Sequence, residues 1–143
     1  MRQVLVTLIY VDTDVILNFL LNRKNEYGKP LGPEAEEFFC KVFVSPFEIL
    51  ISRKTLEELY GTLHDTNKAK MLFEMLKSKQ KLRIVQYNEE DLKEAESIDC
   101  ENRNDALHAL LARKNGAAFV VTRNMRHFRN FSHIIEAKFP KDV

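Results

Sequence analysis

The sequence predicts an α/β domain in which helices cover both faces of a central parallel sheet. Apolar, β-branched runs alternate along the chain with segments whose apolar residues recur at helical spacing. The apolar runs are continuous rather than alternating, as expected for strands that are covered on both faces. Strands separated by helices pair in parallel through right-handed crossovers, so the helices fall on the two faces of the sheet.

Local signals justify each element in turn. The predicted strands are residues 4–11, 47–52, 81–87, 117–124 and 133–137. The predicted helices are residues 15–21, 34–43, 54–63, 66–80, 88–98 and 101–116, followed by a short helix or turn over 124–131. Two chain-breaking pairs mark residues 22–33 as a loop. Pro33 suits the first turn of the helix that follows, Asn88 is a plausible helix cap, and Asn115 with Gly116 forms a common helix terminator.

Length and composition limit the class of protein. The chain has 143 residues, and residues 1–143 are expected to form one domain. Hydrophobic residues make up 45% and charged residues 30%, which argues against long disordered regions. The apolar runs are too short to cross a membrane, and an acidic pair follows the first run where a signal peptide would carry small residues. We therefore expect a cytoplasmic protein without a membrane partner. The net charge of +1 neither requires nor excludes a nucleic-acid partner.

The two cysteines give a separate expectation. Cys40 and Cys100 lie far apart in the sequence. Neither belongs to a CxxC pair or has histidines at a metal-ligand spacing. Both are therefore expected to be buried, reduced thiols.

Two carboxylates stand where the first strand gives way to a helix, in the stretch VTLIYVDTDVILNFLL. Asp12 ends the strand and Asp14 begins the helix. In parallel sheets, functional groups collect at the carboxyl ends of the strands, near the point where strand order reverses. An aspartate at this position also caps a helix, so capping alone is an alternative explanation.

Further acids border apolar helix faces. Glu58 flanks the leucine face of its helix, and Asp105 borders a small-residue stripe formed by Ala106 and Ala109. Either acid alone is explained equally well by pairing with an arginine or an amide. Together with Asp12, however, they follow the first two strands and precede the fourth, so we expect them to converge at one end of the sheet. Converging carboxylates need a cation or protons between them, and an oxygen-only set suits Mg²⁺ or Mn²⁺.

Four segments carry a resemblance to a known family. VDTDVIL, ISRKTLEELYG, NDALHALLA and FVVTRNMRHF, in this order and spacing, resemble the motifs of PIN-domain nucleases, in particular the small prokaryotic ones of the VapC toxin type. The resemblance covers nearly the whole chain. It implies a three-layer α/β/α fold with a central parallel sheet of about five strands in the order 3-2-1-4-5. It also implies a metal-dependent endoribonuclease acting on RNA, a homodimer, and an antitoxin partner. The helices around residues 33–43 and 53–79, rich in Leu and Phe, also favour self-association.

The resemblance assigns roles to individual residues. The acids that match the first three of the family are Asp12, Glu58 and Asp105, expected to be catalytic and to hold Mg²⁺ or Mn²⁺. The fourth motif usually offers an acid at the position of Asn124 or three residues later, where this chain has His127. Asn124 is therefore expected in the metal site as a neutral group. The alternatives are that the site binds metal more weakly, uses one ion rather than two, or recruits Asp14 or Glu101 as a substitute for the missing charge.

The positive charge of a bound dication explains how such a site would cleave a phosphodiester bond. A dication lowers the pKa of a bound water, orients the phosphate and acts as a Lewis acid. Thr122, Arg123 and Arg126, after the fourth strand, are expected to contact phosphates of the nucleic acid at the rim. Solvation of these residues without any contact to RNA is the alternative.

A phosphatase is the enzymatic alternative. DTDVIL also resembles the first motif of haloacid-dehalogenase-type phosphatases, in which Asp12 would attack phosphorus and Asp14 would serve as acid and base. Ser52 resembles their second motif. That fold needs further acids after the fourth strand, and AAFVVTRN supplies none. It also leaves Glu58 and Asp105 unexplained.

A catalytically weak or inactive PIN-like RNA-binding module is the other alternative. Lysines enrich residues 65–83 in positive charge, which would attract an RNA backbone or simply keep a helix face solvated. The histidines form no recognised ligand spacing. His108 is expected to be a packed or surface residue rather than a general base.

Overall fold

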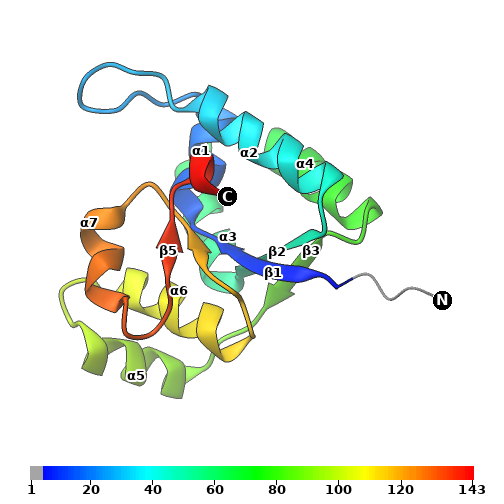
Figure 1. Cartoon of the computed structure of the whole chain (residues 1–143). Coiled ribbons are helices and arrows are strands. Elements are labelled where there is room, and N and C mark those ends of the chain that lie inside the picture. Colours follow the sequence, from blue (N-terminus) through cyan, green and yellow to red (C-terminus); the bar gives the residue numbers. More distant parts are fainter. Residues whose placement is uncertain (1–4) are drawn as a thin grey trace.

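Five parallel strands form a single sheet in the computed structural model, which describes residues 5–143. The strands are β1 (Thr7–Val11), β2 (Phe47–Ser52), β3 (Leu82–Val85), β4 (Val120–Val121) and β5 (Ala137–Lys138). Their order is β3-β2-β1-β4-β5, and every neighbouring pair is parallel. The predicted fold class and strand order are confirmed (Figure 1).

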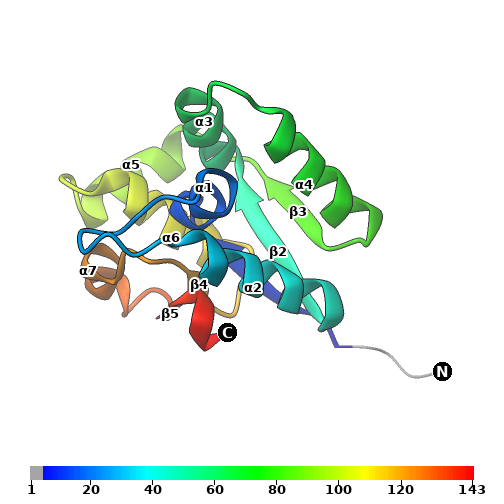
Figure 2. The same cartoon turned by 90° about the horizontal axis from the view of Figure 1, so that it is seen from above.

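Helices cover both faces of this sheet. They are α1 (Thr13–Leu21), α2 (Gly32–Val44), α3 (Arg53–Thr62), α4 (Asn67–Ser78), α5 (Glu89–Ile98), α6 (Arg103–Lys114) and α7 (Met125–Phe128), with 3₁₀ turns η1 (Arg129–Phe131) and η2 (Pro140–Asp142). Helices α1 to α4 pack on one face and α5 to α7 on the other, as Figures 1 and 2 show. Among residues 5–143, no helix is long and apolar enough to span a membrane.

The central strand β1 divides the core in two. Successive side chains of a strand point to opposite faces of the sheet. Ile9 and Val11 accordingly pack with α1 to α4, whereas Tyr10 packs with α5 and α6. All three side chains are fully buried. This arrangement leaves the carboxyl end of β1, followed at once by Asp12, between the two layers of helices.

Three predicted elements differ from the observed ones. The predicted first strand began at Val4, which lies outside the described residues, and β1 begins at Thr7. The fourth strand has only two residues. The fifth strand was expected over 133–137 but comprises Ala137–Lys138, because the backbone N–H groups of Ile134 and Ile135 donate to the carbonyl of Phe131 and continue the η1 turn.

The expectation of buried cysteines is wrong. Cys40 and Cys100 are both exposed, and both are free thiols. On α2 the core-facing positions are occupied by Phe38, Phe39 and Val42, which leaves Cys40 on the outer side of the helix.

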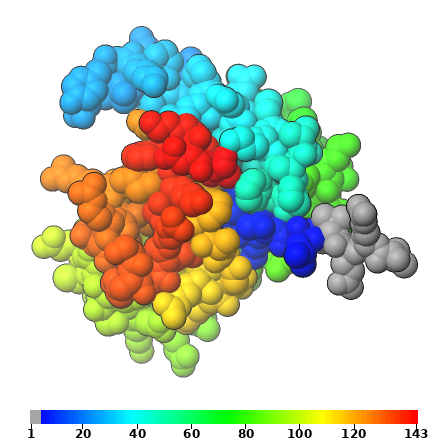
Figure 3. Space-filling model, in the orientation of Figure 1, coloured from blue at the N-terminus to red at the C-terminus, as the bar shows by residue number. Residues whose placement is uncertain are grey.

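The C-terminal segment closes over the edge of the sheet next to α2. Figure 3 shows it as a red ridge between the cyan surface of α2 and the orange surface of α7. Turn η2 contacts α2, and the Lys41 ammonium donates to the backbone carbonyl oxygen of Val143. This packing holds η2 against α2.

Candidate active site

An acidic cleft lies at the carboxyl ends of the central strands and has a volume of about 510 Å³. Its lining residues are Asp12, Thr13, Asp14, Leu17, Arg23, Glu57, Glu58, Gly61, Thr62, Asp105 and Asn124. Five acidic side chains thus face a single arginine. The cleft is strongly negative and suited to a cation.

Asp12 forms the floor of this cleft and caps α1. Its Oδ1 accepts a hydrogen bond from the backbone N–H of Thr13 at 2.9 Å, and its Oδ2 accepts one from the Thr122 hydroxyl at 2.8 Å. Burial raises the pKa of Asp12, the charge of His108 and the Thr122 hydrogen bond lower it, and the negative charges of Asp105 and Glu58 raise it; burial outweighs the lowering effects. The ionised form of Asp12 therefore needs positive charge nearby.

Asp14 lies in the first turn of α1 and has an unsatisfied oxygen. Its Oδ2 accepts a hydrogen bond from the backbone N–H of Arg123 at 3.2 Å, but its buried Oδ1 has no partner among the described residues. Burial and then the charge of Asp12 raise the pKa of Asp14 well above its usual value. A buried carboxylate oxygen without a partner is suited to bind a cation in the cleft.

Glu58 is half-buried on α3 and is held by two donors. Its Oε1 accepts a hydrogen bond from the Thr13 hydroxyl at 2.6 Å and lies 2.7 Å from Nε2 of His108. Burial alone would raise the pKa of Glu58, but the hydrogen bond and charge of His108, with the Thr13 hydrogen bond, outweigh burial and lower it. Glu58 is therefore ionised and fixed in one direction.

A buried polar network extends from Glu58 into the core. His108 is on α6, and its Nδ1 lies 2.6 Å from the Tyr10 hydroxyl, which is 2.8 Å from the Ser52 hydroxyl. Burial opposes protonation of His108, but the surrounding groups, Tyr10 and Glu58 foremost, raise its pKa well above the usual value. A protonated His108 donates to Glu58 and to Tyr10, and Tyr10 then donates to Ser52. Each of these buried groups has a partner.

Asp105 is bound on the opposite wall of the cleft. It lies in the first turn of α6, and its Oδ2 lies 2.7 Å from Nδ1 of His127 on α7. The same Nδ1 lies 2.8 Å from Nδ2 of Asn124, whose backbone N–H donates to the Thr122 hydroxyl at 2.9 Å. His127 therefore joins two of the predicted metal-site residues.

The donor chemistry of the cleft fits a hard dication such as Mg²⁺ or Mn²⁺. Carboxylates and a carboxamide from four parts of the chain line one cleft, and Asp14 Oδ1 is left without a hydrogen-bond partner among the described residues. As the side chains stand, Glu58 and Asp105 are each paired with a histidine. No three His, Cys, Asp or Glu side chains of residues 5–143 are already arranged around a common metal position.

Most, but not all, of the predicted metal-site residues line the cleft. Asp12, Glu58, Asp105 and Asn124 line the same cleft. The predicted substitute Glu101 is exposed and precedes the start of α6, and it is not among the residues lining the cleft.

The predicted phosphate-binding group is split. Thr122 is fully buried and donates to Asp12, so it cannot reach a phosphate at the rim as expected. The Arg123 guanidinium pairs with Glu34 at 3.2 Å. Arg126, on α7, is exposed. Only Arg126 keeps the predicted position at the surface.

Sequence reasoning missed four residues of the site. They are Thr13, Arg23, His108 and His127. Two of them had a local signal: His108 lies three residues after Asp105 on a helix, and His127 lies three residues after Asn124, so each shares a face with a predicted site residue. Arg23 follows the left-handed Asn22 at the end of α1, and nothing in the local pattern indicates that its side chain turns back to the cleft.

The phosphatase interpretation fails on Ser52. This residue caps α3, is fully buried and contacts Tyr10, whereas a second-motif serine would have to meet a phosphate. No acid follows β4 in the cleft, where that fold holds Mg²⁺.

The fold and the cleft define a class of protein: three-layer parallel α/β domains with acids gathered at the carboxyl ends of the central strands. The family model described as "PIN domain" matches residues 9–126. The chain therefore belongs to the PIN domain family, as the resemblance predicted. No curated protein matches this chain.

Solved structures share the fold of this chain. A toxin-antitoxin complex from Klebsiella pneumoniae has a TM-score of 0.59 at 16% identity, covering 92% of this chain and 97% of that one. VapBC2 from Rickettsia felis, bound to a DNA fragment from its promoter, has a TM-score of 0.58 at 17% identity, covering 93% and 98%. VapBC-1 from nontypeable Haemophilus influenzae has a TM-score of 0.59 at 17% identity, covering 94% and 98%. At these identities the likeness is one of fold.

Proposed function

We propose that this protein is a divalent-metal-dependent endoribonuclease and the toxin of a toxin–antitoxin pair. The convergence of Asp12, Glu58, Asp105 and Asn124 on one strongly negative cleft is the observation that carries the proposal. Membership of the PIN domain family, whose members are typically nucleases, supports it.

Asp12 and Asp105 would hold Mg²⁺ or Mn²⁺, together with Glu58 and Asn124. A bound dication would lower the pKa of a water and neutralise charge on the phosphoryl oxygens. The buried, unsatisfied Asp14 Oδ1 supports a cation in this cleft.

The side chains of the protein would position the reactants. Glu58 is ionised and is held by Thr13 and His108, so it is suited to orient the attacking water. Arg23, in the cleft wall, and Arg126, on the exposed side of α7, would bind phosphates without reading bases.

Cleavage of RNA tests the proposal. The Asp12→Asn and Asp105→Asn variants should lose at least about a hundredfold of the Mn²⁺-dependent cleavage of a mixed RNA substrate. Glu101→Gln, an exposed acid outside the cleft, should leave cleavage unchanged. Circular dichroism checks that each variant is folded.

Two results would contradict the proposal. Full activity of either aspartate variant would remove the assigned residues from the site. Metal-independent binding of RNA by the wild type, with no cleavage under any metal, would support the inactive RNA-binding module instead.

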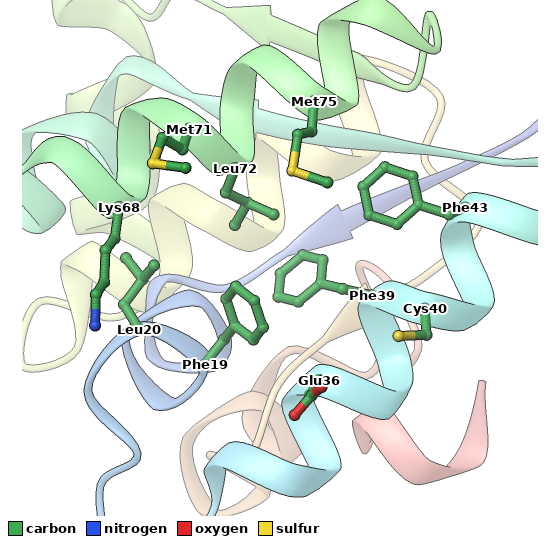
Figure 4. Close-up of a pocket in the computed structure, with 10 residues that line it drawn as sticks. All are labelled: Phe19, Leu20, Glu36, Phe39, Cys40, Phe43, Lys68, Met71, Leu72 and Met75. Atoms are coloured by element: carbon green, nitrogen blue, oxygen red, sulfur yellow. The ribbon is translucent and has the colours of Figure 1, made fainter.

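The proposed antitoxin would bind an apolar groove of about 480 Å³ between α1, α2 and α4. Figure 4 shows aromatic side chains of α2 facing the methionines of α4 across this groove. Its lining residues are Phe19, Leu20, Glu36, Phe39, Cys40, Phe43, Lys68, Met71, Leu72 and Met75. Met71 and Met75 are 62% and 54% exposed, which is a large apolar exposure for two neighbouring side chains.

The groove leads toward the acidic cleft. Leu20 and Lys68 also line a small pocket that includes Thr62, and Thr62 lines the acidic cleft. A partner segment with an apolar face in the groove and a basic side chain beyond Thr62 would neutralise the acids. The three similar structures, one a toxin-antitoxin complex and two of them VapBC assemblies, support a protein partner of this kind.

A further inference from the structure

His127 brings a nitrogen atom to the point where the family pattern offers an acid. Its Nδ1 lies 2.7 Å from Asp105 Oδ2 and 2.8 Å from Asn124 Nδ2. Three polar groups, from α6, from the residue that precedes α7, and from α7 itself, therefore meet around one position. The imidazole is 39% exposed, so an ion can reach this position from solvent.

Hydrogen bonds alone leave this group frustrated. If Nδ1 carries a hydrogen, it donates to Asp105, and the Asn124 amide must turn its Oδ1 toward that same hydrogen, which sets two oxygen lone pairs against each other. If Nδ1 carries a lone pair, it accepts from Asn124 and faces the Asp105 carboxylate with no hydrogen between them. In either state a single hydrogen atom lies among His127 Nδ1, the Asp105 carboxylate oxygen and the Asn124 amide, so one of these contacts has no hydrogen bond.

We propose that this position binds a divalent transition-metal ion, with His127 Nδ1, Asp105 Oδ2 and the carboxamide oxygen of Asn124 as ligands. A cation accepts all three lone pairs at once. Octahedral ligation at about 2.1 Å separates neighbouring ligand atoms by about 3 Å. His127 Nδ1 lies 2.7 Å from Asp105 Oδ2 and 2.8 Å from Asn124 Nδ2, and a half-turn of the Asn124 amide puts its oxygen in the place of Nδ2. The inference rests on the proposed function, because His127 would be a further ligand of the same metal site.

A nitrogen ligand changes which ion the site prefers. Imidazole binds first-row transition ions more strongly than it binds Mg²⁺, whereas carboxylate and carbonyl oxygens suit Mg²⁺. His127→Asp, which restores an acid, should lower the ratio of Co²⁺ affinity to Mg²⁺ affinity by about tenfold. Calorimetric titration of the full chain with each ion alone measures this ratio.

Pulsed electron paramagnetic resonance with Mn²⁺ tests the nitrogen directly. The wild-type protein should show ¹⁴N modulation from a coordinated imidazole. His133→Ala, which removes an exposed histidine outside the cleft, should keep the modulation. His127→Ala should lose it and bind Mn²⁺ about tenfold more weakly or worse, and His127→Asp should lose it while still binding Mn²⁺, so a folding defect in one variant does not decide the result.

The outcomes separate this inference from the proposed function. Mn²⁺ bound by the wild type without ¹⁴N modulation, or modulation that persists in His127→Asp, would overturn the role of His127 and leave the nuclease proposal intact. A wild-type protein that binds no Mn²⁺ and cleaves no RNA would overturn both.

Discussion

Asp14 destabilises the metal-free protein, because it places a carboxylate oxygen in the interior without a partner. Asp14→Asn keeps an oxygen for the backbone N–H of Arg123 and removes the negative charge. We predict that it raises the free energy of unfolding of the metal-free protein at pH 7 by about 1–3 kcal/mol. Urea denaturation measures the change.

The pH dependence of this gain has a definite sign. Burial raises the folded-state pKa of Asp14 well above its ordinary value. Below the unfolded-state pKa the group is protonated in both states and carries no penalty, and the penalty grows as the pH rises from there through the folded-state pKa. The gain from Asp14→Asn should therefore be large at pH 7 and absent near pH 3.5. An equal gain at both pH values would show that charge is not its cause.

Tyr10 supports Glu58 through His108. Its hydroxyl lies within hydrogen-bond distance of His108 and of the hydroxyls of Ser52 and Thr55, and all of these groups are buried. Tyr10→Phe should lower the free energy of unfolding by about 1–3 kcal/mol, because buried polar atoms lose a partner. It should also slow RNA cleavage, because His108 is then less firmly held.

Tyr60→Phe on the exposed side of α3 is the matched control. In thermal denaturation and in single-turnover cleavage, Tyr60→Phe should behave like the wild type. If Tyr10→Phe behaves like Tyr60→Phe in both measurements, the network has no positioning role.

At the scale of the elements, the convergence of the acids was predictable because local signals fix it. Helix α1 begins directly after β1, so Asp12 caps it at the edge of the sheet. Ser52 and Thr55 form a capping box that sets the start of α3, and the helical period then turns Glu58 toward α1. Asp105 lies in the first turn of α6.

The partners of these acids were not predictable, because they depend on pairing between distant segments. His108 and Glu58 are 50 positions apart, and Thr122 and Asp12 are 110 positions apart. Strand β4 has only two residues. Such a short strand shows no alternation of polar and apolar residues, so the sequence does not indicate that Thr122 is buried. The fifth strand is equally short, and the apolar residues Ile134 and Ile135, which precede it, have the stronger strand signal in the sequence.

Asp91 joins α5 to α6 and should contribute measurably to stability. Its Oδ2 accepts a hydrogen bond from the backbone N–H of Asn88, and its Oδ1 pairs with the Lys114 ammonium at 2.7 Å. Asp91→Ala removes both contacts and should lower the free energy of unfolding at pH 7 by about 1–2 kcal/mol. Glu96→Ala, at an exposed position of the same helix, should change it little.

Acid should abolish this difference. Burial alone would raise the pKa of Asp91, but the hydrogen bonds from Lys114 and from the Asn88 backbone lower it below its ordinary value. The stabilisation is therefore complete above the unfolded-state pKa and is lost as the pH falls through the folded-state value. The free energies of unfolding of the wild type and of Asp91→Ala, measured by urea denaturation, should differ at pH 7 and converge toward pH 2. A difference that persists in acid would exclude the ion pair as its source.

At the scale of the whole molecule, the acidic cleft and the apolar groove are expected to act separately. Met75→Asp places a charge in the groove at an exposed position, so the fold and RNA cleavage should be unchanged. Inhibition by the proposed antitoxin should weaken by tenfold or more, that is, by about 1.4 kcal/mol. Titration of RNA cleavage with the purified antitoxin measures this.

Leu92→Asp, at an exposed position of α5 on the opposite face, is the control and should bind the antitoxin normally. Equal binding by Met75→Asp and the wild type would place the antitoxin elsewhere.

The predicted homodimer concerns the same helices. Light scattering at micromolar concentration should give twice the chain mass of 16.8 kDa. If the groove itself is the self-association face, Met75→Asp will be monomeric and the antitoxin will have to compete with the second copy. A mass of one chain for the wild type would contradict the dimer.

Anomalous scattering from a crystal grown with Mn²⁺ tests most directly whether the distant acids share a dication. We expect a peak about 2 Å from oxygen atoms of both Asp12 and Asp105, with both side chains still in the cleft. A well-ordered crystal at millimolar Mn²⁺ with no peak in the cleft, or with the ion bound only at surface carboxylates, would contradict the proposed site and the ribonuclease function built on it.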